Sequence, residues 1–169
     1  MNLSRLFLPL LACVLALAGC GKSADPAAPA ASAATTAAAP ASGPLTVEIT
    51  ANDQMKFNIT RIEAKAGQEM KVVLTNIGSM PKAAMGHNWI LLKKGADAQA
   101  FVNAAVAAMA SDYFPADKAG EVIAHTKLLG PKQTDEVAFT APTEPGEYQF
   151  ICSFPAHFVG GMKGVLVVK

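Results

Sequence analysis

The sequence lacks an excess of charge of either sign, and this absence argues against whole classes of partner. Its 169 residues include 14 Lys and Arg against 13 Asp and Glu. Nucleic-acid-binding proteins neutralise phosphates with a basic surface, and this chain has no surplus of basic residues from which to build one. The same balance argues against electrostatic attachment to an anionic membrane surface.

Cysteine is also scarce, which excludes a disulfide-dense scaffold, and the length excludes a large multidomain enzyme. Only three cysteines occur. Cys13 lies in an apolar amino-terminal segment and Cys20 closes that segment, so Cys152 alone remains in the rest of the chain. The part of the chain that carries Cys152 therefore cannot form an internal disulfide. A lone thiol in an exported protein needs to be buried or occupied.

The amino terminus has no apolar run long enough to cross a membrane, which needs about 20 residues. Leu6–Ala18 is apolar except for Pro9, and its 13 residues fit the core of a secretory signal peptide at residues 1–19. The segment Leu17–Cys20 resembles the lipobox of bacterial lipoproteins, in which the cysteine is lipidated and becomes the first residue of the mature protein. The alternative is an ordinary signal peptide followed by a chance cysteine.

The stretch after Cys20 lacks every residue type that builds a core. Residues 21–44 contain no aromatic and no large aliphatic side chain, and 11 of these 24 residues are Ala and four are Pro. The prolines block a continuous helix. We expect residues 20–44 to be a lipidated cysteine followed by a flexible tether, with one domain at residues 45–169. The alternative is a tail without a role.

From Leu45 onward, short apolar stretches alternate with breaks at Gly and Pro. Leu45–Thr50 alternates apolar and polar residues, which is the period of a half-buried strand. Residues 97–109 differ, because Phe101, Ala105 and Met109 recur every four residues and alanine favours helix. The pattern predicts an all-β Greek-key sandwich with one inserted helix. The other expected strands are residues 57–64, 70–75, 87–92, 137–140, 147–152 and 164–168.

The segment that begins at Cys152 gathers side chains that bind soft metals. Cys152, His157 and Met162 lie within 11 residues between two expected strands, and His87 opens an upstream strand. Two imidazoles, one thiolate and a weakly bound thioether are the ligands of a blue copper electron-transfer site. Each residue alone has a plainer explanation as core, but the spacing C-x4-H-x4-M with an upstream His favours copper.

Zinc is the main alternative metal. Structural zinc prefers several Cys or His ligands without a thioether, so Met162 argues against it. His125 has no neighbours of this kind, and we expect it not to bind the metal.

Four segments of the chain resemble, in the same order, segments of the azurin branch of the cupredoxins. They are Asn52–Asn58, Met85–Trp89, Ile123–Leu128 and Cys152–His157, and the resemblance covers essentially residues 45–169. It implies a Greek-key sandwich of about eight strands with one type 1 copper near one end.

The resemblance also implies roles for individual residues. His87 and His157 would supply nitrogen ligands, Cys152 a thiolate and Met162 an axial thioether. A second set of residues would support these ligands. In that set the carbonyl of Gly86 would be a weak axial contact, Asn88 would join the two ligand segments by hydrogen bonding, and the amide of Phe154 would tune the metal.

Three departures from the azurin pattern have consequences. Azurins place three residues between the second His and the Met, whereas this chain has four, a spacing similar to that of auracyanins, which are lipid-tethered relatives. The azurin disulfide is absent, because Leu45 or Thr46 and Gly67 lie where its cysteines would be. Asn76 stands where azurins often have a titrating histidine, so we expect the reduction potential to depend only weakly on pH.

The resemblance places His157 under an apolar face on which partners would dock. An exposed apolar patch usually marks a docking site, and a weak contact suits a carrier that must release its partner. The expected partners are redox proteins such as cytochromes or a terminal reductase. The expected docking residues are Met55, Met80, Ala84, Met85, Phe154, Pro155, Phe158 and Val159.

The sequence thus predicts a lipid-anchored blue copper electron carrier that cycles between Cu(II) and Cu(I). It would be exported and held in the periplasm or at the cell surface by lipidated Cys20. No general base or substrate pocket is suggested, so an enzyme is not expected. Periplasmic copper storage or delivery is the first alternative, and a tethered adhesion module with vestigial ligands is the second.

Overall fold

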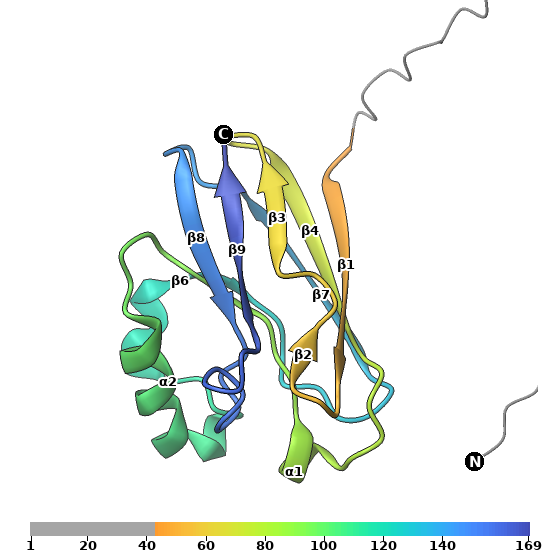
Figure 1. Ribbon diagram of the computed structural model, residues 1–169. Coiled ribbons are helices and arrows are strands. Elements are labelled where there is room, and N and C mark those ends of the chain that lie inside the picture. The colour runs from red at the N-terminus through yellow and green to blue at the C-terminus, as the bar shows by residue number, and fades with distance from the viewer. Residues whose placement is uncertain (1–42) are drawn as a thin grey trace, which may run out of the picture. The chain divides into compact units, whose positions relative to one another are not determined.

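The computed structural model describes residues 43–169, so the expected signal peptide, Cys20 and the tether up to residue 42 lie outside the described residues. The described part folds into two facing β-sheets (Figure 1). The first sheet runs in the order β2 (Lys56–Phe57), β1 (Leu45–Asn52), β4 (Glu69–Asn76) and β7 (Thr134–Thr140). The second runs in the order β3 (Arg61–Ala64), β9 (Lys163–Val168), β8 (Gly146–Ile151), β5 (Ile90–Leu92) and β6 (Val122–His125).

Alternating burial explains why the two sheets face each other. In β4 the side chains of Met70, Val72 and Leu74 are buried, and the residues between them are partly exposed. Successive side chains of a strand point to opposite faces, so this alternation turns one apolar face inward. The inner faces of both sheets enclose one core, which includes Ile49, Trp89, Phe150 and Leu166. The predicted β-sandwich is confirmed.

The expected strand at residues 57–64 is wrong in one respect, because two strands in different sheets occupy it. β2 pairs with β1, whereas β3 pairs with β9. Asn58 ends the first pairing, since its side chain accepts a hydrogen bond from the Thr50 amide at 2.7 Å. The backbone then crosses to the other sheet, and the carbonyl of Thr60 accepts from the Val165 amide.

The expected strand at residues 87–92 is shorter than predicted. Only β5 is regular strand, and it pairs with β8 and β6. His87 lies before it in an isolated bridge to Leu129, with hydrogen bonds of 3.1 Å and 2.8 Å between the two backbones. The strand β6 was not among the expected strands.

The expected helix forms as α2 (Ala98–Ala107), which lies over the outer face of the second sheet. Asp97 caps its amino terminus by accepting hydrogen bonds from the amides of Gln99 and Ala100. Phe101 and Ala105 are buried as predicted. Met109 is 68% exposed, because α2 ends before it and a 3-10 turn, η1 (Met109–Ser111), changes the direction of the chain.

Two further short helices are present, α1 (Lys82–Met85) and the 3-10 helix η2 (Ala116–Glu121). The single inserted helix of the prediction is therefore accompanied by short helical turns. Among residues 43–169, no helix combines the length and apolarity that a membrane span requires.

The order of the strands brings three separate segments to one end of the sandwich. β8 ends at Ile151 and β9 begins at Lys163, so the intervening loop lies at this end. The turn between β1 and β2 and the helix α1 lie beside it, at the lower end of the view in Figure 1. We call this the loop end, and every predicted metal ligand lies there.

Candidate metal centre

The structure brings His87, Cys152 and His157 together although they come from two distant segments. One ligand atom from each residue lies within 4.8 Å of the others. The Sγ atom of Cys152 is 3.4 Å from Nδ1 of His157, and the two imidazole rings are 4.9 Å apart between centroids. All three residues are buried, with at most 2% of their surface exposed. Three of the four predicted ligands thus converge on one point.

The ring nitrogens of His87 indicate that the place where the three ligands meet suits a metal. Both ring nitrogens of His87 are buried without a hydrogen-bond partner among the described residues. An unsatisfied buried polar atom is costly, so such atoms usually have a ligand that completes them. Imidazole and thiolate donors together suit copper in both of its common oxidation states.

Met162, the fourth predicted ligand, is fully buried, and its backbone is hydrogen-bonded to two of the other ligand residues. Its amide donates to the carbonyl of His157 at 2.9 Å, and its carbonyl accepts from the amide of Cys152 at 3.1 Å. The backbone of residues 152–162, which we call the ligand loop, is therefore closed on itself. This closure fixes the place of the thioether residue before any metal binds.

Burial sets the protonation of the ligands in the metal-free protein. It raises the pKa of the Cys152 thiol to about 12, and backbone hydrogen bonds from Asn88 and Phe154 oppose this effect. Burial lowers the pKa of His157 to about 4, with a smaller contribution from the charge of His87. Burial also lowers the pKa of His87. Both imidazoles are therefore neutral near pH 7 and ready to bind a metal, whereas the thiol must release its proton.

Asn88 and Ser153 connect the two segments that carry ligands, because each follows a ligand in sequence. The Asn88 side chain donates to Oγ of Ser153 at 2.8 Å and accepts from the Ser153 amide at 2.9 Å. The hydroxyl of Ser153 donates in turn to the carbonyl of Tyr113 at 2.7 Å. Sequence reasoning did not single out Ser153 or Tyr113. A small hydroxyl residue directly after the ligand Cys152 was the available signal for Ser153.

Gly86 has no room for a side chain. A Cβ atom there would lie 2.8 Å from the carbonyl oxygen of Lys82 and 3.0 Å from the side chain of Leu128. Only glycine therefore lets the chain leave α1 and enter the metal centre at His87. The role expected for the carbonyl of Gly86 stays a prediction.

The expected docking residues all belong to the loop end, but they are not equally exposed. Met80, Ala84 and Val159 are exposed, and 70% of the surface of Val159 is open to solvent. Half-buried members are Met55, Met85 and Pro155, and buried members are Phe154 and Phe158.

His125 lies outside the metal centre. It is exposed on β6, and its ring stacks on Phe114 with 4.3 Å between centroids. The histidine expected not to bind the metal is thus absent from the ligand cluster.

Comparisons with known proteins agree with this geometry. A family model for copper binding proteins of the plastocyanin/azurin family matches residues 44–169. The chain is 41% identical over 128 residues to azurin from Pseudomonas aeruginosa, covering 73% of this chain and 84% of that protein. It is 43% identical over 125 residues to azurin-1 from Alcaligenes xylosoxydans xylosoxydans, covering 72% of this chain and 95% of that protein.

Two solved structures of auracyanins are also similar. The reduced auracyanin of Roseiflexus castenholzii has a TM-score of 0.67 and 35% identity, and the match covers 75% of this chain and 99% of that one. Auracyanin A of Chloroflexus aurantiacus, described as a "blue" copper protein, has the same TM-score and 38% identity, and the match covers 75% of this chain and all of that one.

The family and the geometry agree on the ligands. His87, Cys152, His157 and Met162 form a type 1 copper site. The chain therefore belongs to the plastocyanin/azurin family of copper-binding proteins, and it is a blue copper electron-transfer protein rather than an enzyme.

Proposed function

We propose that this protein is an exported, lipid-anchored carrier that accepts electrons from one redox protein and passes them to another. The observation that carries this proposal is the closed arrangement of His87, Cys152, His157 and Met162, buried at one end of a rigid sandwich. When bound, copper supplies a one-electron couple between Cu(II) and Cu(I).

The residues around the copper site favour fast electron exchange because they are fixed in advance. The ligand loop is closed by backbone hydrogen bonds at Met162, and Asn88 joins it to the segment of His87. Donors that cannot move give both oxidation states the same surroundings, which minimises rearrangement during transfer. We also assign to the amide of Phe154 and the carbonyl of Gly86 the task of tuning the site from outside the four main ligands.

Partners are proposed to dock on the apolar part of the loop end. Exposed Met80, Ala84 and Val159 supply a surface that a partner can cover, and His157 lies buried in the same loop as Val159. A transient contact with cytochromes or a terminal reductase fits a carrier that must release each partner.

The anchor is proposed to be a lipid on Cys20, with residues 20–44 as the tether between membrane and domain. The Ala- and Pro-rich composition of that stretch supports a flexible spacer, and the lipobox-like segment Leu17–Cys20 supports lipidation. Replacement of the cysteine, Cys20→Ser, should move the protein from the membrane fraction to the soluble fraction. If C20S stays with the membranes, the anchor is elsewhere.

The visible and paramagnetic-resonance spectra of the copper-loaded protein test the carrier function. A carrier should show intense blue absorption when oxidised and should lose copper slowly to a chelator. Periplasmic copper storage or delivery, the alternative function, predicts ready loss of metal and no intense blue band. A colourless oxidised protein would therefore contradict the proposal.

A further inference from the structure

Two lysines lie directly on the ligand loop. The ammonium group of Lys56, on β2, donates a hydrogen bond to the carbonyl of Gly160 at 2.7 Å. The ammonium group of Lys163, at the start of β9, lies 4.4 Å from the centroid of the Phe158 ring. Both side chains are exposed, so two positive charges flank the ligand loop, in which His157 lies buried.

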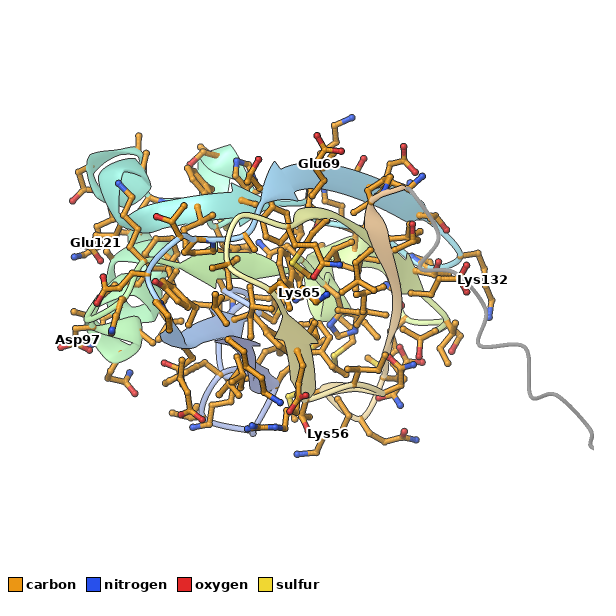
Figure 2. All side chains as sticks on the ribbon, turned by 90° about the horizontal axis from the view of Figure 1, so that it is seen from above. Lys56, Lys65, Glu69, Asp97, Glu121 and Lys132 are labelled. Carbon is orange, nitrogen blue, oxygen red and sulfur yellow. The ribbon has the colours of Figure 1, made fainter. Side chains whose placement is uncertain are left out.

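Neither of these lysines is neutralised by a carboxylate in the part of the chain that the structure describes. Among the ion pairs of the described residues, all within 4.0 Å, none involves Lys56 or Lys163. Lys132, in the turn before β7, is another lysine without an ion pair among the described residues, and it donates to the carbonyl of Ile77 at 2.9 Å. Figure 2 shows Lys56 and Lys132 projecting outward at the edge of the domain.

The acidic groups of the loop end do not cancel this charge. Asp112 is paired with Lys82 at 2.9 Å. Asp53 accepts hydrogen bonds from the amide and the hydroxyl of Ser79, at 2.8 Å and 2.9 Å, and is half-buried. Among the described residues, the unpaired charges beside the ligand loop are thus those of Lys56 and Lys163, against one half-buried aspartate at the loop end.

The net charge of the domain does not explain the excess of positive charge beside the ligand loop. Residues 45–169 exclude Arg5, Lys22 and Asp25, which leaves 12 basic and 12 acidic residues. A neutral domain with a positive loop end must be negative elsewhere, so it carries a dipole whose positive end lies at the docking face. Such a dipole orients a charged partner before contact.

We propose that the natural redox partner is a protein that presents acidic side chains around an apolar centre, and that Lys56 and Lys163 guide it onto the ligand loop. This inference rests on the docking face proposed above and adds the chemistry of the partner to it. The apolar side chains supply the contact, and the lysines supply orientation and the rate of encounter. A second copy of this chain is disfavoured, because two such faces would bring like charges together.

Oxidation of the reduced, copper-loaded protein by hexacyanoferrate(III) tests this charge. One electron leaves the protein and reduces the iron to hexacyanoferrate(II). At an ionic strength of about 10 mM, where screening is weak, the double variant Lys56→Gln/Lys163→Gln should react roughly threefold or more slowly than the wild type. Added salt should slow the wild type and remove the difference. Lys65→Gln, which removes one exposed lysine in the turn between β3 and β4, is the control for loss of a charge away from the loop end and should react like the wild type.

Two further measurements separate the alternatives. With a cationic oxidant, tris(phenanthroline)cobalt(III), the double variant should be oxidised faster than the wild type, because two repelling charges have been removed. Electron self-exchange, measured by NMR line broadening, should become faster as salt is added. Self-exchange that is fastest at low salt would make a second copy the preferred occupant and overturn the proposal.

Failure of this inference can be told apart from failure of the proposed function. If K56Q/K163Q and K65Q behave alike with both oxidants while the protein is blue, the lysines do not guide partners but the carrier function stands. If the protein is not blue, the carrier function itself fails.

Discussion

His157 combines deep burial with a titratable ring, and this combination links metal binding to stability. In the metal-free protein its imidazole must stay neutral, because burial and the nearby His87 both disfavour its charged form. Protonation of this ring therefore favours the unfolded state over the folded state.

We expect the metal-free protein to lose stability as the pH falls from 7 to 4. The pKa of His157 is lowered from 6.5 to about 4 in the folded state. A lowered folded-state pKa contributes stability that is complete above the unfolded value and is lost as the pH falls towards the folded value. The free energy of unfolding in urea should decrease by about 3 kcal/mol over this range through His157. The variant His157→Gln should lack this part of the decrease, and His125→Gln should retain it. Equal slopes in the wild type and H157Q would contradict the assignment.

Asn76 is the basis of a second prediction, which concerns how the reduction potential depends on pH. It is buried, its amide donates to the carbonyl of Leu129 at 3.3 Å, and its oxygen accepts from the amide of Gly78 at 2.9 Å. An amide does not titrate, so the reduction potential should change between pH 6 and 8 by far less than the about 59 mV per unit that a fully coupled proton gives. A voltammetric titration measures this. Asn76→His should introduce a dependence, and an inflection in the wild type near neutrality would refute the prediction.

The ligand loop contains a turn whose backbone is unfavourable for the residue it carries. Ala156 has φ of +69°, and the amide of His157 donates to the carbonyl of Phe154 at 3.1 Å across the turn. Pro155 and Ala156 are its central residues. A positive φ at the second of these positions favours glycine, because a Cβ atom is strained there.

Replacement of this residue by glycine, Ala156→Gly, should therefore stabilise the protein by about 1 kcal/mol. Ala104→Gly in α2 is the matched control, and it should lower stability by about 1 kcal/mol because glycine is a poor helix former. Urea unfolding of both metal-free variants gives the comparison. If both variants were equally destabilised, the turn would carry no strain.

The elements that sequence could predict are those whose pattern is local. The apolar residues of β4 and β9 predict the alternating burial that these strands show. The C-x4-H-x4-M spacing likewise placed three ligands within one loop. The strand over residues 57–64 could not be divided from sequence, because the apolar pattern runs through Asn58 while the pairing partner changes from β1 to β9. The bridge of His87 to Leu129 depends on two segments meeting in space, which no local pattern reveals.

The supporting shell of the site was harder to predict than the ligands. Asn88 was expected to join the ligand segments, and its contacts with Ser153 supply such a connection. Ser153 and the carbonyl of Tyr113 complete a chain of hydrogen bonds across three loops. Each member of that chain is ordinary in sequence, so only its position in the fold gives it a role.

At the scale of the whole molecule, the loop end is the face through which we propose that this carrier meets its partners. Ala84 is exposed on α1 within that face. A carboxylate there, Ala84→Asp, would have to lose water in every encounter complex, which is costly for a charged group.

We therefore expect Ala84→Asp to slow electron self-exchange by on the order of tenfold while the visible spectrum of the copper stays unchanged. The measurement belongs at about 0.5 M salt, where long-range charge effects are screened. Ala138→Asp, an exposed position on β7 in the other part of the sandwich, is the control and should leave the rate unchanged. Unchanged kinetics in A84D would place the docking face elsewhere.

The closure of the ligand loop at Met162 also governs how copper is acquired. Because the ligands are at most 2% exposed and backbone hydrogen bonds close the loop on itself, we expect an ion from solution to reach the sulfur during local openings of this loop. Loading is then a matter of brief local openings, whose frequency amide hydrogen exchange at Met162 reports directly. We expect the protein to take up copper slowly and, once loaded, to release it slowly.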